Sequence, residues 1–107
     1  MAAPRLGVLL ATAPEEGDFP LVQGVVEAAL SAGRDVGLFL MDDGVRYALD
    51  PRLAPLLRAG VEVTACATDA EARGLPAGVI ESAGVLLGSQ HDHAPLVRDS
   101  DRFLSFT

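Results

Sequence analysis

Few residues of this sequence could do chemistry, and one of them is unique. Cys66 is the only cysteine and lies in the stretch TACATDAEARGL, residues 64–75. A thiolate is the nucleophilic form of cysteine, so a well-placed cysteine could do chemistry here. The alternative is a small packed side chain, because free cysteine is among the residue types most often buried. These residues alone leave both interpretations open.

A second polar group lies nearer the C-terminus. His91 and His93 alternate in the stretch SQHDH, residues 89–93. With the Asp42–Asp43 pair or Cys66 they could form a metal site, since zinc takes nitrogen, sulfur and oxygen ligands. The same histidines could serve a hydrolytic site, although neighbours in sequence rarely reach the geometry of a catalytic triad. Solvated loop histidines are the simpler interpretation.

Composition excludes several functions. All eight basic residues are arginine, so a Schiff-base enzyme and a phosphate loop ending in Gly-Lys-Ser/Thr are both excluded. A Gly-x-Gly-x-x-Gly motif is also missing, and the adjacent glutamates of ATAPEEGD, residues 11–18, would repel a nucleotide phosphate. We therefore expect no nucleotide and no other cofactor.

Charge and cysteine content bear on partners and location. The net charge of −7 disfavours attraction to nucleic acid or to an anionic membrane. A lone cysteine forms no intramolecular disulfide, and the first residues offer only a short apolar run without the pattern of a signal peptide. We expect a cytoplasmic protein whose partners are other proteins.

Strand and helix patterns alternate along the chain, and these elements must position the polar residues. Apolar residues at three- and four-residue spacing predict a helix over 19–32 with Asp18 as its cap. Asp50 and Pro51 are typical of another helix start, and Asp42 to Gly44 of a turn. Strands are expected at residues 6–11, 35–41, 61–66, 85–87 and 102–106, and a last short helix at 94–99.

This series predicts one α/β domain over residues 1–107. About five strands joined through helices indicate an open, mostly parallel, doubly wound sheet of the flavodoxin-like kind, with helices on both faces. Such sheets bind ligands beyond the carboxyl ends of their strands, where the strand order reverses. Cys66 would lie at that point if the third strand neighbours the first, as in the flavodoxin order.

Cys66 also precedes a predicted helix start. Thr68 to Glu71, TDAE, matches a capping box, in which the threonine and glutamate side chains satisfy free amides of the first helical turn. A helix N-terminus carries a partial positive charge, which favours the thiolate form of a nearby cysteine. Asp69 and Glu71 in the first turn oppose this effect, so a packed thiol is still the favoured interpretation from position alone.

Three segments in register resemble the DsrE/TusD family of sulfur-relay proteins, which share a small flavodoxin-like (DsrEFH-like) domain. The first is GLFLMDDGV, residues 37–45, an apolar strand that ends in an Asp-Gly-Val turn. The second is GVEVTAC, residues 60–66, followed by Arg73-Gly74. The third is SDRFLSF, residues 100–106. The resemblance covers nearly the whole chain.

The resemblance implies a function for Cys66. It matches the sulfur-carrying cysteine of the family, which holds sulfur as a persulfide and passes it from a donor protein to an acceptor protein. Asp43 and the Arg73-Gly74 pair match residues that would contact substrate or partner, and His91 is a further candidate contact. Arg73 could instead face water or pair with Glu71 or Glu27. Some family members lack an active cysteine, so a non-catalytic assembly subunit is the alternative.

Assembly with further copies is also expected. The hydrophobic content of 50% is high for 107 residues, so part of the surface should be buried between subunits. We expect a homo-oligomer, and the resemblance implies a trimer or a hexamer.

Overall fold

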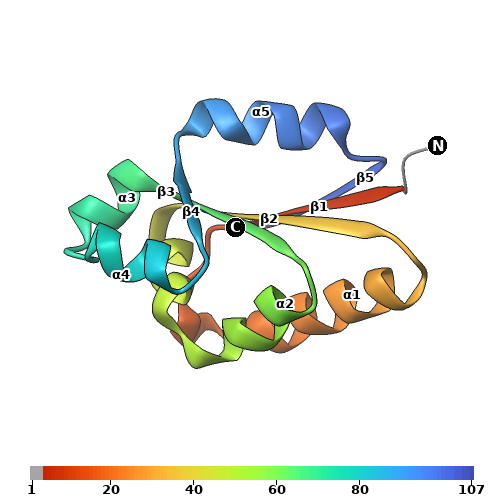
Figure 1. Cartoon of the computed structure of the whole chain (residues 1–107), viewed down its shortest axis with the longest axis horizontal. Coiled ribbons are helices and arrows are strands. Elements are labelled where there is room, and N and C mark those ends of the chain that lie inside the picture. The colour runs from red at the N-terminus through yellow and green to blue at the C-terminus, as the bar shows by residue number, and fades with distance from the viewer. Residues whose placement is uncertain (1–3) are drawn as a thin grey trace.

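A five-stranded parallel sheet forms the centre of the protein within residues 4–107 (Figure 1). The structure, a computed structural model, describes these residues without the side chains of residues 90 and 92–94. The strand order is β4-β3-β2-β1-β5, and each neighbouring pair is parallel. The predicted α/β sheet is therefore confirmed. Its strands are β1 (Arg5–Leu10), β2 (Asp35–Leu40), β3 (Glu62–Cys66), β4 (Leu86–Gly88) and β5 (Arg102–Phe106).

Helices cover both faces of the sheet. Figure 1 shows α1 (Phe19–Ser31) and α2 (Ala54–Arg58) on one face and α5 (Gln90–Asp99) on the other. The chain crosses the sheet from β1 to β4 and then returns to place β5 on the far side of β1. Parallel crossovers are right-handed, so this reversal moves the connecting helix to the opposite face. The remaining helical segments are α3 (Ala67–Ala72), α4 (Ala77–Ser82) and the 3-10 helices η1 (Pro14–Glu16), η2 (Asp42–Leu49) and η3 (Pro51–Leu53).

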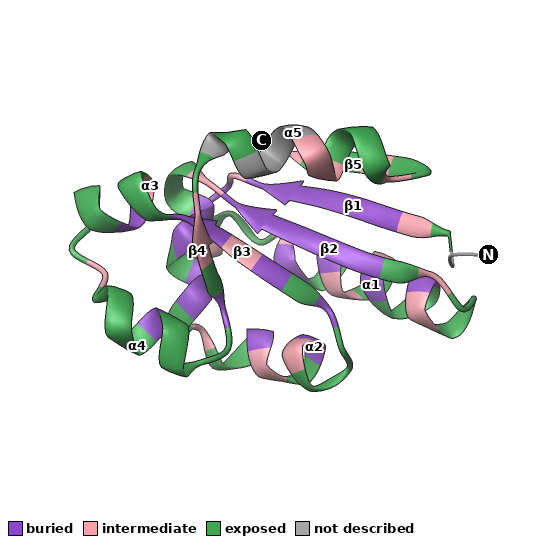
Figure 2. Ribbon diagram, turned by 45° about the horizontal axis from the view of Figure 1, so that its top comes forward, coloured by how far each residue is buried: buried purple, intermediate pink, exposed green. Residues whose placement is uncertain are grey.

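The most completely buried part of the core lies between the sheet and α1. Strands β1 and β2 are buried along almost their whole length (Figure 2), as expected for parallel strands covered on both faces. Val22 and Val26 of α1 are fully buried against them. On the other face, Gly7 and Gly37 let α5 approach closely, because a Cβ at either position would crowd Leu96. None of the helices in the described part of the chain is long and apolar enough to span a membrane.

The point at which the strand order reverses differs from the predicted one. β3 pairs with β2 and β4 and does not neighbour β1. The order reverses instead between β1 and β5, because β5 is the strand added on the far side. The condition under which Cys66 would occupy the reversal point is therefore not met, and this part of the sequence argument is wrong.

Three local predictions are also corrected. Asp18 makes no cap hydrogen bond, because its backbone is already helical and its carboxylate accepts the hydroxyl of Thr12 at 2.7 Å. The expected capping box at Thr68 does not form, since β3 runs directly into α3 and Cys66 itself is the N-cap residue. Asp42 to Gly44 begin η2 rather than a simple turn. The cap at Asp50 is confirmed by a hydrogen bond from the Arg52 amide at 2.9 Å.

Candidate functional site

The strand register brings the candidate residues to one edge of the sheet. Leu40 at the end of β2 pairs with Ala65 of β3, and Cys66 pairs with Gly88 at the end of β4. The segments that leave these three strands begin with Asp42, Ala67 and Ser89 or their immediate neighbours. The predicted convergence at the carboxyl edge is thus present, with Cys66 in the middle strand of the three.

Cys66 is buried at this edge. Only 2% of the residue is exposed, and it belongs to the hydrophobic core. Its backbone is still extended, while the next residue begins α3, so the thiol lies between a strand and a helix. Side chains alternate along a strand, which places Cys66 on the same face of β3 as Thr64 and Glu62. Access to the sulfur therefore requires α3 or its surroundings to move.

Four residues hold α3 against η2, and we call them the edge network: Asp42, Asp43, Asp69 and Arg73. Arg73 Nε donates to Asp43 Oδ1 at 2.9 Å, and Arg73 Nη1 donates to the Asp69 carbonyl at 3.1 Å. The Asp69 carboxylate in turn accepts the Asp42 amide at 2.8 Å. The hydrogen bond to Asp43 raises the pKa of Arg73.

The edge network settles the partner of Arg73. Its partner is Asp43, not Glu71 or Glu27, because η2 and α3 follow neighbouring strands and meet at the edge. Two of the predicted contact residues thus form an ion pair with each other. Asp69 was overlooked as a link, since its place in the sequence suggested only a first-turn acid of α3.

Two glycines shape the same edge. A Cβ at Gly44 would overlap the backbone carbonyl of Leu10, so only glycine lets η2 pass so close to the end of β1. Gly74 has a φ of 71°, the left-handed conformation that commonly ends a helix, and it directly follows Arg73, the C-cap residue of α3. Gly74 therefore has a structural reason to be glycine, apart from any contact with a partner.

The histidine region gives no metal centre in the part of the chain that is described. His91 is exposed, and its backbone amide donates to Ser89 Oγ at 3.2 Å. Among the described residues, no three histidine, cysteine or acidic side chains gather closely enough to hold a metal ion. The His93 side chain lies outside the described residues, so the proposed pairing of His91 with His93 remains a prediction.

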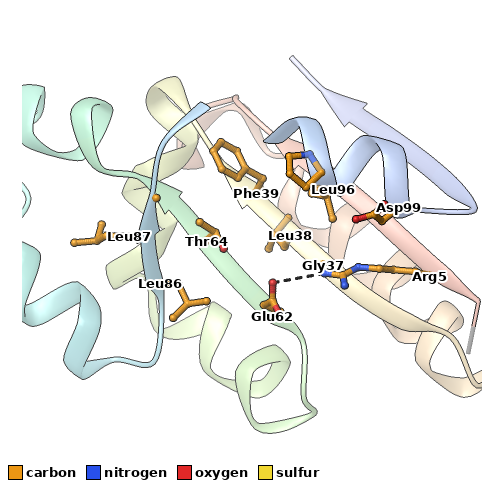
Figure 3. Close-up of a pocket in the computed structure, with 12 residues that line it drawn as sticks. Arg5, Gly37, Leu38, Phe39, Glu62, Thr64, Leu86, Leu87, Leu96 and Asp99 are labelled. Atoms are coloured by element: carbon orange, nitrogen blue, oxygen red, sulfur yellow. Dashed lines mark ion pairs between the residues drawn. The ribbon is translucent and has the colours of Figure 1, made fainter. Parts of the chain in front are cut away.

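A cavity of about 380 Å³ lies elsewhere, between α5 and the open part of the sheet. Figure 3 shows Arg5 of β1 extended across Gly37 of β2 toward Glu62 of β3. The sequence reasoning missed this region, although alternation places all three residues on one face of neighbouring strands. We call it the trough.

Comparison with known proteins decides the family. Residues 22–106 match the DsrE/DsrF-like family. The chain belongs to this family. The resemblance inferred from the three sequence segments is therefore confirmed, and the match includes Cys66 and every residue of the edge network.

Solved structures share the same DsrE/DsrF-like fold. A conserved protein of unknown function, BT1422 from Bacteroides thetaiotaomicron, superposes with a TM-score of 0.76 at 19% identity, covering 95% of this chain and 94% of its own. The ychN protein from E. coli also has a TM-score of 0.76, at 23% identity, covering 96% and 99%. No curated protein matches. These structures establish the fold of the present DsrE/DsrF-like chain.

Proposed function

We propose that this DsrE/DsrF-like protein is a sulfur carrier that holds a persulfide on Cys66 and passes it between partner proteins. The observation that carries the proposal is the position of Cys66, at the carboxyl end of a central strand and the N-cap of α3. The family match adds support, because the DsrE/DsrF-like family is generally associated with sulfur relay. His91, exposed beside the neighbouring strand end, is a candidate partner contact.

The chemistry needs one thiol. The Cys66 thiolate attacks the outer sulfur of a donor persulfide, R–S–SH, and the donor sulfur–sulfur bond breaks. Cys66–S–SH forms, and the donor leaves as the thiolate R–S⁻. An acceptor thiolate then attacks the outer sulfur and displaces the Cys66 thiolate. Neither step changes the overall oxidation level, so no resolving cysteine is required.

Burial of the thiol sets the condition for transfer. Cys66 is 2% exposed, so we propose that α3 swings away from η2 to admit the donor. α3 has six residues, and only Ala70 among them is buried. Exposed elements with few buried side chains open at low cost. In this proposal Asp43 and Arg73 control access to Cys66 through their ion pair, and a docked partner competes for it.

The test is sulfur loading followed by mass spectrometry. Wild-type protein is incubated with a cysteine desulfurase and cysteine, and the intact mass is compared with that of Cys66→Ser. We expect a gain of one sulfur, about 32 Da, in the wild type alone, and its removal by dithiothreitol. An equal gain in Cys66→Ser, or no gain with any donor that loads a control thiol, would refute the proposal.

The burial of Cys66 also supports a second candidate, a non-catalytic assembly subunit. In that case the thiol is packing material, and exposed apolar residues such as Leu21, Val79 and Leu86 are covered by other subunits. Light scattering at micromolar concentration tests the assembly: a homo-oligomer, a trimer or a hexamer, is expected, and a monomer contradicts it. Failure to load sulfur together with a stable oligomer would favour this candidate.

A further inference from the structure

The trough differs from the Cys66 edge because it is open and already shaped. It lies beside α5, on the face of the sheet that α5 covers only in part, over β2, β3 and β4 (Figure 2). Its lining is apolar along most of its length and charged at one end. The apolar part includes Phe39, Leu86, Pro95 and Leu96, and Leu86 is 56% exposed. The charged end holds Arg5, Glu62 and Asp99.

Arg5 has unused hydrogen-bonding capacity. Its Nε is buried and has no hydrogen-bond partner among the described residues. Its Nη2 lies 3.6 Å from Glu62 Oε1, which is an ion pair without a hydrogen bond. Guanidinium groups form their strongest bonds to planar carboxylates through two parallel N–H donors. A ligand carboxylate could accept the hydrogen bond that Arg5 Nε does not make within the protein.

The backbone beneath Arg5 is fitted to hold it in place. Its guanidinium lies across β2 at Gly37, where a Cβ would come within 2.6 Å of Nη2. The Arg5 main chain is fixed as well, since its amide donates to Asp101 Oδ2 at 2.7 Å and its carbonyl accepts the Asp101 amide at 2.9 Å. The base of the Arg5 side chain is therefore fixed, and its guanidinium rests on the open surface of Gly37.

Glu62 and Asp99, the two carboxylates at the charged end of the trough, indicate which net charge a ligand should have. A simple anion would approach Arg5 against the repulsion of Glu62 and Asp99. Asp99 already accepts a bond from Arg98 at 3.2 Å, whereas the one polar contact of the Glu62 side chain within the described residues is its long pair with Arg5. Glu62 is thus available to a cation placed beside the carboxylate that Arg5 takes.

We propose that the trough binds a zwitterionic α-amino acid with an apolar side chain. The ligand carboxylate takes the unpaired N–H donors of Arg5, the ammonium lies against Glu62, and the side chain rests on Phe39, Leu86 and Leu96. The cavity of about 380 Å³ has room for such a molecule. This inference does not depend on persulfide chemistry at Cys66.

Calorimetry and NMR with L-methionine test the proposal, because its flexible side chain adapts to an irregular apolar surface. We expect saturable binding that shifts the resonances of Thr64, Leu86 and Leu96. N-acetyl-L-methionine lacks the ammonium, and L-methionine amide lacks the carboxylate. Each should bind at least about tenfold more weakly, since each loses one charged hydrogen-bonded contact.

Matched variants locate the site. Arg5→Gln and Glu62→Gln should each weaken L-methionine binding about tenfold or more. Arg46→Gln should leave the binding unchanged, because Arg46 pairs with Glu15 and does not line the trough. Circular dichroism of each variant checks that the fold is retained. Three outcomes overturn the proposal: no binding by the folded wild type, binding of either blocked analogue as tightly as L-methionine, or a trough occupied by a second copy of the chain, seen as dimer-dependent shifts of the same resonances.

Discussion

The edge around Cys66 and the trough differ in accessibility and in how their charged residues are paired. The edge has a nucleophile, Cys66, that is buried beside a cavity of about 410 Å³ but is not part of its lining, and Arg73 there is paired with Asp43. The trough has a cavity of about 380 Å³ without a cysteine in its lining, and the Nε of Arg5 there lacks a hydrogen-bond partner among the described residues. The difference suggests two modes of action: the edge must open to work, whereas the trough needs only a ligand.

The glycines of the two regions have different surroundings, and replacing Gly44 at the edge should have the largest effect on stability. Gly44→Ala would press a Cβ into the backbone carbonyl of Leu10, which cannot move without disturbing β1. We expect a loss of about 3 kcal/mol in the free energy of unfolding, because overpacking typically costs about 1 to 3 kcal/mol and a clash with fixed backbone lies at the upper end of that range. Urea denaturation measures it, and a loss below about 1 kcal/mol would contradict the close packing of η2.

Gly37→Ala is the matched change in the trough and should cost less. Its Cβ would meet Arg5 Nη2 at 2.6 Å and Leu96 Cδ1 at 2.8 Å, which are the ends of flexible side chains. We expect a loss of about 1 kcal/mol in stability, because these side chains can turn aside. The displaced guanidinium should also abolish the binding of L-methionine. Retained binding with full stability would show that Arg5 does not lie across Gly37.

Arg73→Ala should make Cys66 easier to reach. The ion pair with Asp43 is partly exposed, so solvent screens it and its contribution is small. If that contribution keeps α3 closed, its loss raises the open population by up to about fivefold. The rate at which iodoacetamide alkylates Cys66 in the folded protein measures this population.

Arg46→Ala is the control for that experiment. Arg46 pairs with Glu15 of η1 and does not contact α3 in any hydrogen bond or ion pair of the described residues. Alkylation of Cys66 should therefore proceed at the wild-type rate. Equal acceleration by both changes would mean that general destabilisation, rather than the edge network, exposes the thiol.

The smallest effect concerns pH. Hydrogen bonds from the Arg52 side chain, and secondarily from its amide, lower the pKa of Asp50 below its ordinary value of 3.8. The charged carboxylate therefore stabilises the fold above pH 3.8, and this contribution is lost as the pH falls through the lowered pKa. Asp50→Asn keeps a capping side chain but should lose part of this stability at neutral pH, and the loss should become smaller as the pH falls through the lowered pKa of Asp50.

The stability of wild type and Asp50→Asn, measured by urea denaturation at several pH values, checks the prediction. The difference between the two proteins should shrink as the pH falls, because both then carry a neutral residue at position 50. A difference that stays constant down to pH 2 would assign the effect of Asp50 to packing instead of charge.

Local patterns predicted the elements well, and long-range geometry explains what they missed. The apolar runs of β1 and β2 and the Asp50-Pro51 cap depend on neighbours in sequence, and each was found. The strand order depends on which distant strands pair, and no local pattern places β3 beside β2 instead of β1.

The same limit applies to the candidate site. The sequence placed Cys66 at a strand end before a helix, which is correct, but its burial depends on how α3 packs. The ion pair of Asp43 with Arg73 joins segments 30 residues apart, so only the sheet register could reveal it. The capping box at Thr68 failed because β3 continues into α3 without the expected break.

The most direct test of sulfur transfer through Cys66 is the urea dependence of sulfur loading. The rate at which the wild type gains about 32 Da from a desulfurase and cysteine is followed by mass spectrometry at low urea concentrations, with desulfurase activity controlled at each concentration. If α3 opens locally, loading is measurable in water and changes only slightly with urea, because little surface is exposed. No loading, or loading that rises as steeply as global unfolding, would show that Cys66 is a packed residue and contradict the account.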